Sequence, residues 1–413
     1  MKLHGQGRAA LAGDPRTAEM LGWRERRRSR PDPQILLKPR TGDPTLEPWI
    51  VPPWFAPAAG IGALCGSRPR PARCWTYLPG PPGLAKYLER LARPPATRIR
   101  LGLFGLGRIG GIASVVLAAM PAANSGIAEI LVDDVDTANR ERWLLELGAF
   151  TSWRGREGAP RLRPTSLGEV FHQCDVFVFA AATGVPPLGS PGDVRMVQFA
   201  PNRAILRACL EQARAADYSG LFLVVSDPVD WLAQSAFRDS NTAGETFTGE
   251  GLAPERIAGL GLGVMWGRAL DCARREGWDG TVARRGAAYG PHGDGVLVFD
   301  DLRAPTSARS EPLTRAAREG NIAVRGLGFL PFVAPGVSSI ALTLPLLLAG
   351  REALASVFLD GVFFGAPCRQ EWGIYPTRHA LAPEVAHALR GLHGGLRRQA
   401  ASLGLFPVEP PRS

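Results

Sequence analysis

The chain has 413 residues, of which 45% are hydrophobic and 21% charged, a composition typical of a globular protein with two or three folding units. Its formal net charge of +10 would suit an acidic partner, but residues 1–97 hold 16 Lys and Arg against 7 Asp and Glu, and the rest is nearly neutral. This distribution argues against a nucleic-acid groove on the main body. No apolar run reaches the roughly 18–20 residues of a membrane span, and no signal core follows the first charges. A cytoplasmic protein with neither a membrane nor a nucleic-acid partner is therefore expected.

Residues 1–97 are rich in proline and arginine and carry 16 of the 37 prolines. Apart from a candidate short helix over residues 83–92, they show little hydrophobic periodicity. Such a segment buries too little apolar surface to offset its ordering entropy, which favours a disordered extension. Two alternatives stay open: translation that truly starts further downstream, or an arm for organelle targeting or nucleic-acid binding.

From Arg98 onward, short apolar strands alternate with helices. Strands are expected at residues 99–104, 127–132, 176–182 and 221–226, and helices at 112–120, 138–147 and 197–215, with a Gly/Pro loop at 184–192. Strands that alternate with helices predict a doubly wound, mainly parallel sheet. Residues 98–236 are therefore assigned to a Rossmann domain in an α/β protein.

Residues 237–413 have a mixed pattern and are assigned to an α+β substrate domain. We expect a polar insert at 238–250, helices at 264–276, from about 337 and at 383–403, and strands at 281–289 and 296–299. The six cysteines form no C-x-x-C pair or compact cluster, so they are interpreted as reduced thiols, and no metal site is predicted.

A glycine loop follows the first predicted strand of this Rossmann domain directly: Gly105-Leu-Gly107-Arg108-Ile109-Gly110. In a dinucleotide site, the first glycine permits a tight turn, the second lets the backbone approach a pyrophosphate, and the third lets helix and strand pack closely. Asp134 ends the next predicted strand, 24 residues after Gly110, where an acid accepts hydrogen bonds from the adenosine ribose. Because an acid there would repel a 2′-phosphate, the pattern favours NAD as the cofactor.

Several further strings occur in order between about residues 99 and 405. Residues 181–187 read A-A-T-G-V-P-P, residues 191–195 read P-G-D-V-R with Asn202 after them, residues 225–230 read V-S-D-P-V-D, and residues 290–294 read G-P-H-G-D. In these strings the chain resembles the lactate/malate dehydrogenase family of NAD-dependent L-2-hydroxyacid dehydrogenases, as a divergent member. The resemblance covers roughly three quarters of the chain.

The resemblance implies the roles of individual residues. His292 would be the acid/base, Arg195 a lid arginine that polarises the substrate carbonyl, and Arg268 a bidentate clamp for the substrate carboxylate. Asp227 stands where the family has an asparagine that contacts substrate and nicotinamide. The remaining cofactor contacts carried over by motif are Thr183, Gly184, Asn202 and Ser226. A small 2-oxo or 2-hydroxy acid is the implied partner, and a homodimer or homotetramer the implied assembly.

The chain also departs from the family pattern. In the gap-free alignment that selects Arg268, Met265 replaces the aspartate that orients the histidine. An alternative register selects Arg274 with Asp271, but it needs six residues inserted and six removed, so the gap-free register is preferred. Pro187 stands near the position of the malate-specific arginine, which favours a lactate-like substrate with an apolar side chain.

Three functional hypotheses follow. The first is an NAD-dependent oxidoreductase that interconverts a 2-hydroxy acid and its 2-oxo acid, lactate-like more than malate-like. The second, suggested by Met265 and Asp227, is a degenerate NAD-binding member with a sensor or assembly role and little catalysis. The third is altered chemistry, in which the carboxylate of Asp227 favours a cationic or imine-forming substrate.

Overall fold

The computed structural model describes residues 98–151, 158–184, 194–244, 246–247, 251–359, 361–370, 373–377 and 379–405. Before residue 98 it gives the backbone of four short strands that form one sheet in the order β1-β2-β3-β4, namely β1 (Leu3–Gln6), β2 (Ala9–Ala12), β3 (Ile35–Pro39) and β4 (Arg73–Tyr77). The sequence pattern did not predict these strands. The remainder of residues 1–97, including the candidate helix at 83–92, lies outside the described residues. The predicted disorder of this segment therefore stays a prediction.

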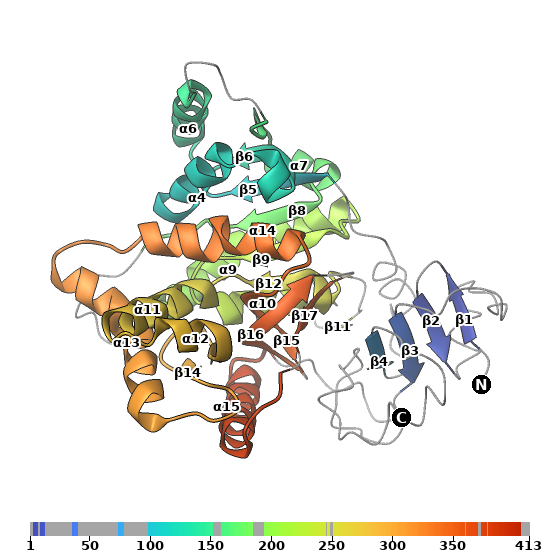
Figure 1. Cartoon of the computed structure of the whole chain (residues 1–413). Helices are drawn as coiled ribbons and strands as arrows, with labels where there is room; N and C mark the ends of the chain where they lie inside the picture. Colours follow the sequence, from blue (N-terminus) through green and yellow to red (C-terminus); the bar gives the residue numbers. More distant parts are fainter. Residues whose placement is uncertain are drawn as a thin grey trace.

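A nine-stranded sheet forms the centre of the described body, and its strands run from β6 near the top of Figure 1 to β15–β17 lower down. The order is β17-β16-β15-β12-β9-β8-β5-β6-β7. Six of the strands pair in parallel: β7 (Arg161–Pro164), β6 (Ile127–Asp133), β5 (Ile99–Phe104), β8 (Val176–Phe179), β9 (Leu221–Val224) and β12 (Ile257–Gly259). Their order is that of a dinucleotide-binding sheet, which confirms the predicted α/β fold with its doubly wound parallel sheet.

Three antiparallel strands continue the same sheet beyond β12: β15 (Ala353–Leu359), β16 (Val362–Gln370) and β17 (Ile374–Pro376). The sheet is therefore shared by both predicted parts of the chain. Helix α10 (Val229–Ser240) also runs across the predicted division between residues 236 and 237. The division into two domains stays a prediction.

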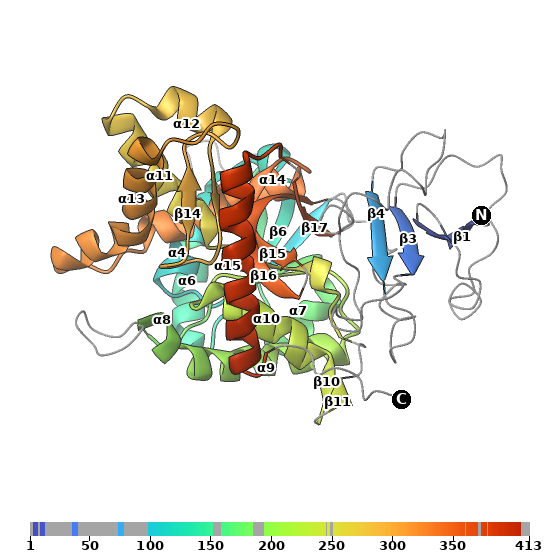
Figure 2. The ribbon, with the colours of Figure 1, turned by 90° about the horizontal axis from the view of Figure 1, so that it is seen from below.

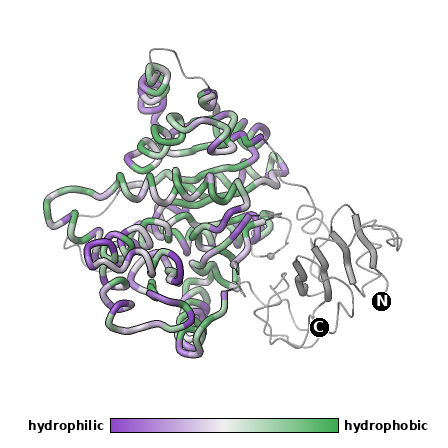
Figure 3. Tube along the Cα trace, in the orientation of Figure 1, coloured by the Kyte–Doolittle hydropathy of each residue, from purple (hydrophilic) through white to green (hydrophobic). Residues whose placement is uncertain are grey.

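Successive side chains of a strand point to opposite faces of the sheet. Because both faces of the parallel strands are apolar, helices cover both of them. One face packs against α4 (Arg108–Ala119), α6 (Thr137–Ala149), the π-helical segment η2 (Pro335–Ala341) and α14 (Thr343–Leu348). The other packs against α7 (Leu167–Gln173), α9 (Phe199–Ala215) and α10. Hydrophobic residues are concentrated along these central strands in Figure 3.

A smaller layer extends from the end of the sheet. Helices α11 (Leu262–Arg275), α12 (Asp279–Arg285) and α13 (Ser307–Gly326) enclose an apolar core with the hairpin β13 (Ala287–Tyr289) and β14 (Leu297–Phe299). Helix α15 (Pro383–Ser402), shown in red in Figure 2, packs beside β16 with its buried side chains in a separate cluster. None of the helices in the described part of the chain is both long and apolar enough to cross a membrane.

Two expected elements differ from the structure. The strand expected over residues 281–289 is mostly helix α12, which has Asp279 in its first turn and ends at Arg285 with Gly286 as its C-cap, so only Ala287–Tyr289 is extended. The long apolar helix expected from about residue 337 is short and irregular. It is π-helical over Pro335–Ala341 and then α-helical only to Leu348, because Pro335 and Pro345 remove backbone donors and Gly350 has a φ of 65°.

Other segments were not assigned from the sequence: α7, α10, α13, β7, β12 and β15–β17. Within the expected polar insert, α10 extends to Ser240 and a small hairpin pairs β10 (Thr242–Ala243) with β11 (Thr246–Phe247). Residues 248–250 lie outside the described residues, as do residues 185–193 of the expected Gly/Pro loop.

Candidate active site

The glycine loop joins β5 to α4 and has the geometry that the motif predicts. Gly105 has a φ of 95°, and its N–H donates to the carbonyl oxygen of Asp133 at 2.9 Å. A Cβ on Gly105 would collide with the backbone of Ala181, and one on Gly110 with the carbonyl oxygen of Gly105. A Cβ on Gly107 would meet nothing within 4 Å. The open space therefore lies over Gly107, at the N-terminal end of α4, where free N–H groups suit the pyrophosphate of a dinucleotide.

The two acidic residues at the end of β6 have different surroundings. Asp133 is buried and pairs with Arg140 at 3.0 Å, and burial raises the pKa of its carboxyl. Asp134 is half-buried, and its Oδ2 accepts hydrogen bonds from the N–H of Leu106 at 2.5 Å and from Asn139 Nδ2 at 3.2 Å. Asp134 is thus held directly beside the glycine loop, which is where a ribose-binding acid is required.

Four other residues predicted to bind cofactor lie at the ends of β8 and β9 or beside them. Asn202 is fully buried, and its Oδ1 accepts a hydrogen bond from the backbone N–H of Thr183 at 3.0 Å while its Nδ2 donates to the carbonyl of Asp227 at 2.7 Å. Ser226 is buried and donates to the carbonyl of Ala181 at 2.6 Å. Asn202 and Ser226 therefore tie the two loops together, whereas Thr183 and Gly184 are exposed.

A cavity of about 320 Å³ contains the four residues that were predicted to be catalytic: Arg195, Asp227, Arg268 and His292. Arg195 comes from the short helix α8 (Val194–Val197), Asp227 follows β9, Arg268 lies on α11, and His292 lies in the turn between β13 and β14. Ile109, at the start of α4, also lines this cavity. The cavity therefore extends from the glycine loop to the histidine.

The imidazole of His292 is held by the backbone. Its Nδ1 lies 2.9 Å from the carbonyl oxygen of Gly261, the residue that precedes α11. Because a carbonyl oxygen only accepts, Nδ1 carries the hydrogen, and in the neutral imidazole Nε2 keeps its lone pair. Burial lowers the pKa of His292 to about 4, with nearby Asp227 opposing this shift and Arg195 and Arg268 adding to it.

Two aspartates stand near this histidine. Asp227 Oδ1 lies 3.6 Å from His292 Nε2, on the side of the ring that faces the cavity. Asp230 is buried; its Oδ2 accepts a hydrogen bond from the backbone N–H of His292 at 2.7 Å, and its Oδ1 accepts one from Ser356 Oγ at 2.6 Å. Burial raises the pKa of Asp230 to about 6. The string V-S-D-P-V-D thus supplies one carboxylate to the cavity and one that holds the histidine turn.

Arg268 and Arg274, the candidates for the carboxylate clamp in the two alignment registers, have different surroundings in the structure. Arg268 lines the cavity, and its Nη1 donates to the carbonyl of Ala317 at 3.2 Å and lies 3.5 Å from the sulfur of Met265. Burial lowers the pKa of Arg268 to about 10. Arg274 is exposed and pairs with Asp271 at 3.3 Å. The gap-free register is therefore the one that places an arginine beside His292.

Helix α13 adds residues that the sequence analysis missed. Arg318, Asn321, Ile322 and Arg325 line the cavity at positions i, i+3, i+4 and i+7, which is one face of a helix. That spacing was a usable signal, but charged and small residues interrupt the apolar pattern of this segment. With these residues, four arginines and two aspartates line the cavity, the aspartates being Asp227 and Asp294.

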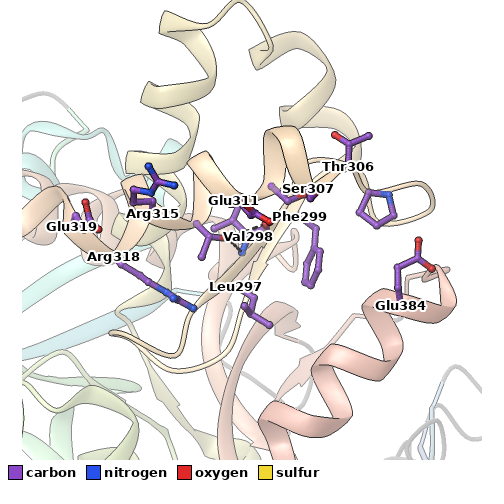
Figure 4. Close-up of a pocket in the computed structure, with 13 residues that line it drawn as sticks. Leu297, Val298, Phe299, Thr306, Ser307, Glu311, Arg315, Arg318, Glu319 and Glu384 are labelled. Atoms are coloured by element: carbon purple, nitrogen blue, oxygen red, sulfur yellow. Dashed lines mark hydrogen bonds between the residues drawn. The ribbon is translucent and has the colours of Figure 1, made fainter.

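A second hollow, of about 600 Å³, lies on another side of α13 and is shown in Figure 4. Its lining comes from β14, the segment before α13, α13 itself and Glu384 of α15. It shares Arg318 with the first cavity and contains none of the predicted catalytic residues. A large volume is not by itself evidence of a catalytic site. The first cavity contains the predicted catalytic residues and is therefore the candidate active site.

The described cysteines take no part in the site. Cys174, Cys209, Cys272 and Cys368 are free thiols, and all but Cys272 are buried. In the part of the chain that the structure describes, no group of three or more His, Cys, Asp or Glu side chains is arranged to hold a metal ion.

Curated proteins with similar sequences are lactate and malate dehydrogenases, although no family model matches the chain. The L-lactate dehydrogenase of Bacillus velezensis is 28% identical over 176 residues, which is 42% of this chain and 47% of that enzyme. The malate dehydrogenase of Sorangium cellulosum is 25% identical over 297 residues, which is 66% of this chain and 86% of that enzyme. The match spans about half the length of the lactate dehydrogenases.

Solved structures of the same enzymes share the fold. A lactate dehydrogenase from a Medee basin deep-sea metagenome library superposes with a TM-score of 0.59 and 16% identity, over 75% of this chain and 100% of that one. The malate dehydrogenase of Archaeoglobus fulgidus in complex with NADH gives 0.59 and 18%, over 74% and 100%. The chain therefore has the fold of the lactate and malate dehydrogenases. The resemblance carried by its motifs is confirmed at low sequence identity.

Proposed function

We propose that this protein is an NAD-dependent oxidoreductase that interconverts a 2-hydroxy acid and its 2-oxo acid. The observation that supports this most directly is the single cavity in which His292, Arg195 and Arg268 meet, with Ile109 of the glycine-loop helix in the same wall. Proton transfer, carboxylate binding and cofactor binding are then available in one place. The relatives support the same reaction class, because they are named as lactate and malate dehydrogenases.

The residues of the cavity can carry out the proton and charge steps. In the oxidation direction, the lone pair on His292 Nε2 accepts the proton of the substrate hydroxyl, while Arg268 binds the substrate carboxylate with its planar fork. Arg195 stabilises the oxygen as negative charge develops on it. NAD⁺ bound over Gly107 would supply the acceptor for the hydride that leaves substrate C2. The glycine loop and Asp134 are the residues that would hold it.

The pKa of His292 favours this direction. With a pKa of about 4, the imidazole is neutral at physiological pH and ready to accept a proton. In the reverse direction, carbonyl reduction needs the imidazolium, which is scarce near neutrality in the unliganded protein. A bound carboxylate beside Arg195 and Arg268 would offset their positive charge and raise the pKa of His292.

We further propose a lactate-like substrate in preference to malate. The string around Pro187 provides no arginine for a second substrate carboxylate, and apolar side chains of Val264, Ile322 and Leu330 line part of the cavity. Residues 185–193 lie outside the described residues, so this preference rests on their sequence. We also propose a cytoplasmic homodimer or homotetramer, by resemblance, which light scattering on the purified protein would test.

A panel of 2-oxo acids with NADH, and of 2-hydroxy acids with NAD⁺, tests the proposed function. We expect turnover of small apolar acids, and His292→Gln should lower kcat/KM by roughly 10²–10⁴-fold because the acid/base is lost. His387→Gln, on the exposed face of α15, is the matched control and should have no effect. Failure of the wild-type protein to turn over any acid while it binds NADH would contradict the proposal.

A second candidate function is a degenerate NAD-binding protein with a sensor or assembly role. Met265 favours it, because this residue is fully buried and supplies no carboxylate to the site. The same NADH titration and substrate panel separate the two functions. Binding without turnover would support the second candidate, whereas turnover that His292→Gln abolishes would exclude it.

A further inference from the structure

The carboxylate of Asp227 is the least explained group in the cavity. Its Oδ1 is buried and accepts no hydrogen bond from any residue that the structure describes, although it lies 3.6 Å from His292 Nε2. The guanidinium of Arg268 contacts Met265 and Ala317 instead. The Asp227 side chain as a whole is 34% exposed, and a ligand that brings a hydrogen-bond donor to its buried Oδ1 would be favoured.

The hydroxyl of a 2-hydroxy acid could be that donor in the oxidation direction, but in the reduction direction a 2-oxo acid cannot. Its carbonyl oxygen only accepts hydrogen bonds, and it would face an ionised carboxylate that also only accepts. Reduction of the carbonyl needs a proton, and the histidine beside it is neutral in the unliganded protein, because burial lowers its pKa to about 4. An iminium group, by contrast, carries a positive charge and, when formed from a primary amine or ammonia, an N–H that can donate to Asp227.

We propose that the site reduces the iminium that a 2-oxo acid forms with an amine, with Asp227 as the residue that binds the iminium nitrogen. This inference rests on the proposed function for its cofactor and for its carboxylate clamp. It differs in the atom that is attached to C2, which is nitrogen in place of oxygen.

The hydride step balances without a proton donor in the site. Before it, the 2-oxo acid and the free amine condense with loss of water and uptake of one proton from solvent, which gives the iminium. Hydride from NADH then bonds to C2, and the π electrons of the C=N bond become the lone pair on nitrogen, giving a 2-amino acid substituted on nitrogen and NAD⁺. The positive charge on nitrogen is lost in this step. The carboxylate of Asp227 therefore favours binding of the iminium, and no group has to supply a proton to the product.

The charges in the cavity indicate an amine that is itself an acid. Four arginines line the cavity, two more than the aspartates that line it with them, Asp227 and Asp294. Arg318 and Arg325 lie two helical turns apart on α13, away from the clamp on α11. We therefore expect an amino acid, with its own carboxylate near α13, to be a better amine than ammonium or methylamine.

The test measures NADH oxidation with a panel of 2-oxo acids, each alone and with ammonium, methylamine, glycine or alanine, at an alkaline pH where free amine is present. Mass spectrometry identifies the product. We expect the rate with an amino acid to exceed that with the 2-oxo acid alone by about tenfold or more, with a secondary amine as product. Asp227→Asn should lower the amine-dependent rate by roughly 10²–10³-fold, the usual effect of losing one electrostatic contact to the reacting group.

Asp271→Asn is the matched control, because it makes the same change on the exposed face of α11, and thermal melting checks that both variants fold. If 2-oxo acids alone are reduced and amines add nothing, the inference fails and the proposed function stands. If turnover requires an amine, the inference holds and the hydroxy-acid reaction is rejected. If NADH binds but neither mixture turns over, both fail. Should Asp227→Asn not fold, the amine dependence of the wild-type protein alone decides.

Discussion

The carbonyl of Gly261 holds the ring of His292, the proposed acid/base, and the lack of a side chain at position 261 makes room for that ring. A Cβ on Gly261 would lie 2.6 Å from His292 Cγ and 2.7 Å from Nδ1. We therefore expect Gly261→Ala to displace the imidazole and to lower kcat by roughly 10²-fold or more, the lower end of the contribution of a general acid/base. Steady-state kinetics with whichever substrate the panel identifies would measure this.

Gly267→Ala is the control for this change, because Gly267 lies on α11, the helix that Gly261 precedes, and its Cβ would make only an ordinary contact with Ser338 at 3.6 Å. Alanine also has the higher helix propensity, so stability should be kept or slightly raised. Equal kinetic effects in the two variants would mean that the position of the Gly261 carbonyl does not matter.

Arg268 and Arg274 allow a second comparison within α11. Arg268→Ala removes the proposed carboxylate clamp and should raise KM strongly and lower kcat/KM by about 10²-fold or more, given that hydrogen bonds to charged groups contribute about 1.5–3 kcal/mol each. Arg274→Ala changes only a solvent-exposed ion pair and should leave both constants unchanged. The reverse result would favour the alternative alignment with insertions, in which Arg274 takes the place of Arg268.

The residues of the candidate site differ in how readily the sequence alone could place them. His292 and Arg195 lie in short strings whose order is specific, so the motifs were enough to predict both. Arg318 and Arg325 were missed because charged and small residues interrupt the apolar pattern of their helix, and they enter the cavity only through the packing of α13 against α11. The Gly261 carbonyl is a backbone atom, which no motif of side chains can reveal.

Among the secondary-structure elements, the glycine loop offers a matched pair of substitutions. Gly107→Ala adds a methyl group where nothing lies within 4 Å, so folding should be unaffected while the approach of a pyrophosphate is blocked. Gly110→Ala drives a methyl group into the carbonyl oxygen of Gly105 and should destabilise the protein itself. We expect the first variant to lose NADH binding at an unchanged melting temperature and the second to melt lower. Equal loss of stability in both would argue against a phosphate role for Gly107.

The elements that were predicted well are those whose pattern is local. Strand β5 was predicted over its full length, and α11 and α15 to within two residues at each end, because each carries a clear apolar period. The strand expected over residues 281–289 was wrong because β-branched and small residues do not distinguish a short helix from a strand. The antiparallel strands β15–β17 complete the sheet only through long-range pairing, which the local pattern does not contain.

For the molecule as a whole, two buried groups give opposite dependences of stability on pH. The folded pKa of His292, about 4, lies below the usual 6.5, so its contribution is present above pH 6.5 and is lost as the pH falls to 4. The folded pKa of Asp230, about 6, lies above the usual 3.8, so its contribution is present at low pH and is lost as the pH rises to 6. Each amounts to about 3 kcal/mol at most, so the two nearly cancel between pH 4 and 6.5.

Asp230→Asn should reveal the dependence of the free energy of unfolding on pH that is due to His292. The variant is expected to be less stable throughout, and between pH 4 and 6.5 its free energy of unfolding should rise more steeply with pH than that of the wild-type protein, by up to about 3 kcal/mol. Urea denaturation at a series of pH values would measure both curves, with Asp271→Asn as the control. Parallel curves for Asp230→Asn and the wild-type protein would show that the two groups do not titrate as their burial requires.

The contact between His292 and the Gly261 carbonyl also has an evolutionary consequence. A histidine oriented by a side chain depends on that side chain, whereas one oriented by a backbone carbonyl depends on a neighbouring position that can carry no Cβ. Among relatives of this chain, sequences that carry an apolar residue at position 265 should therefore keep the glycine at position 261.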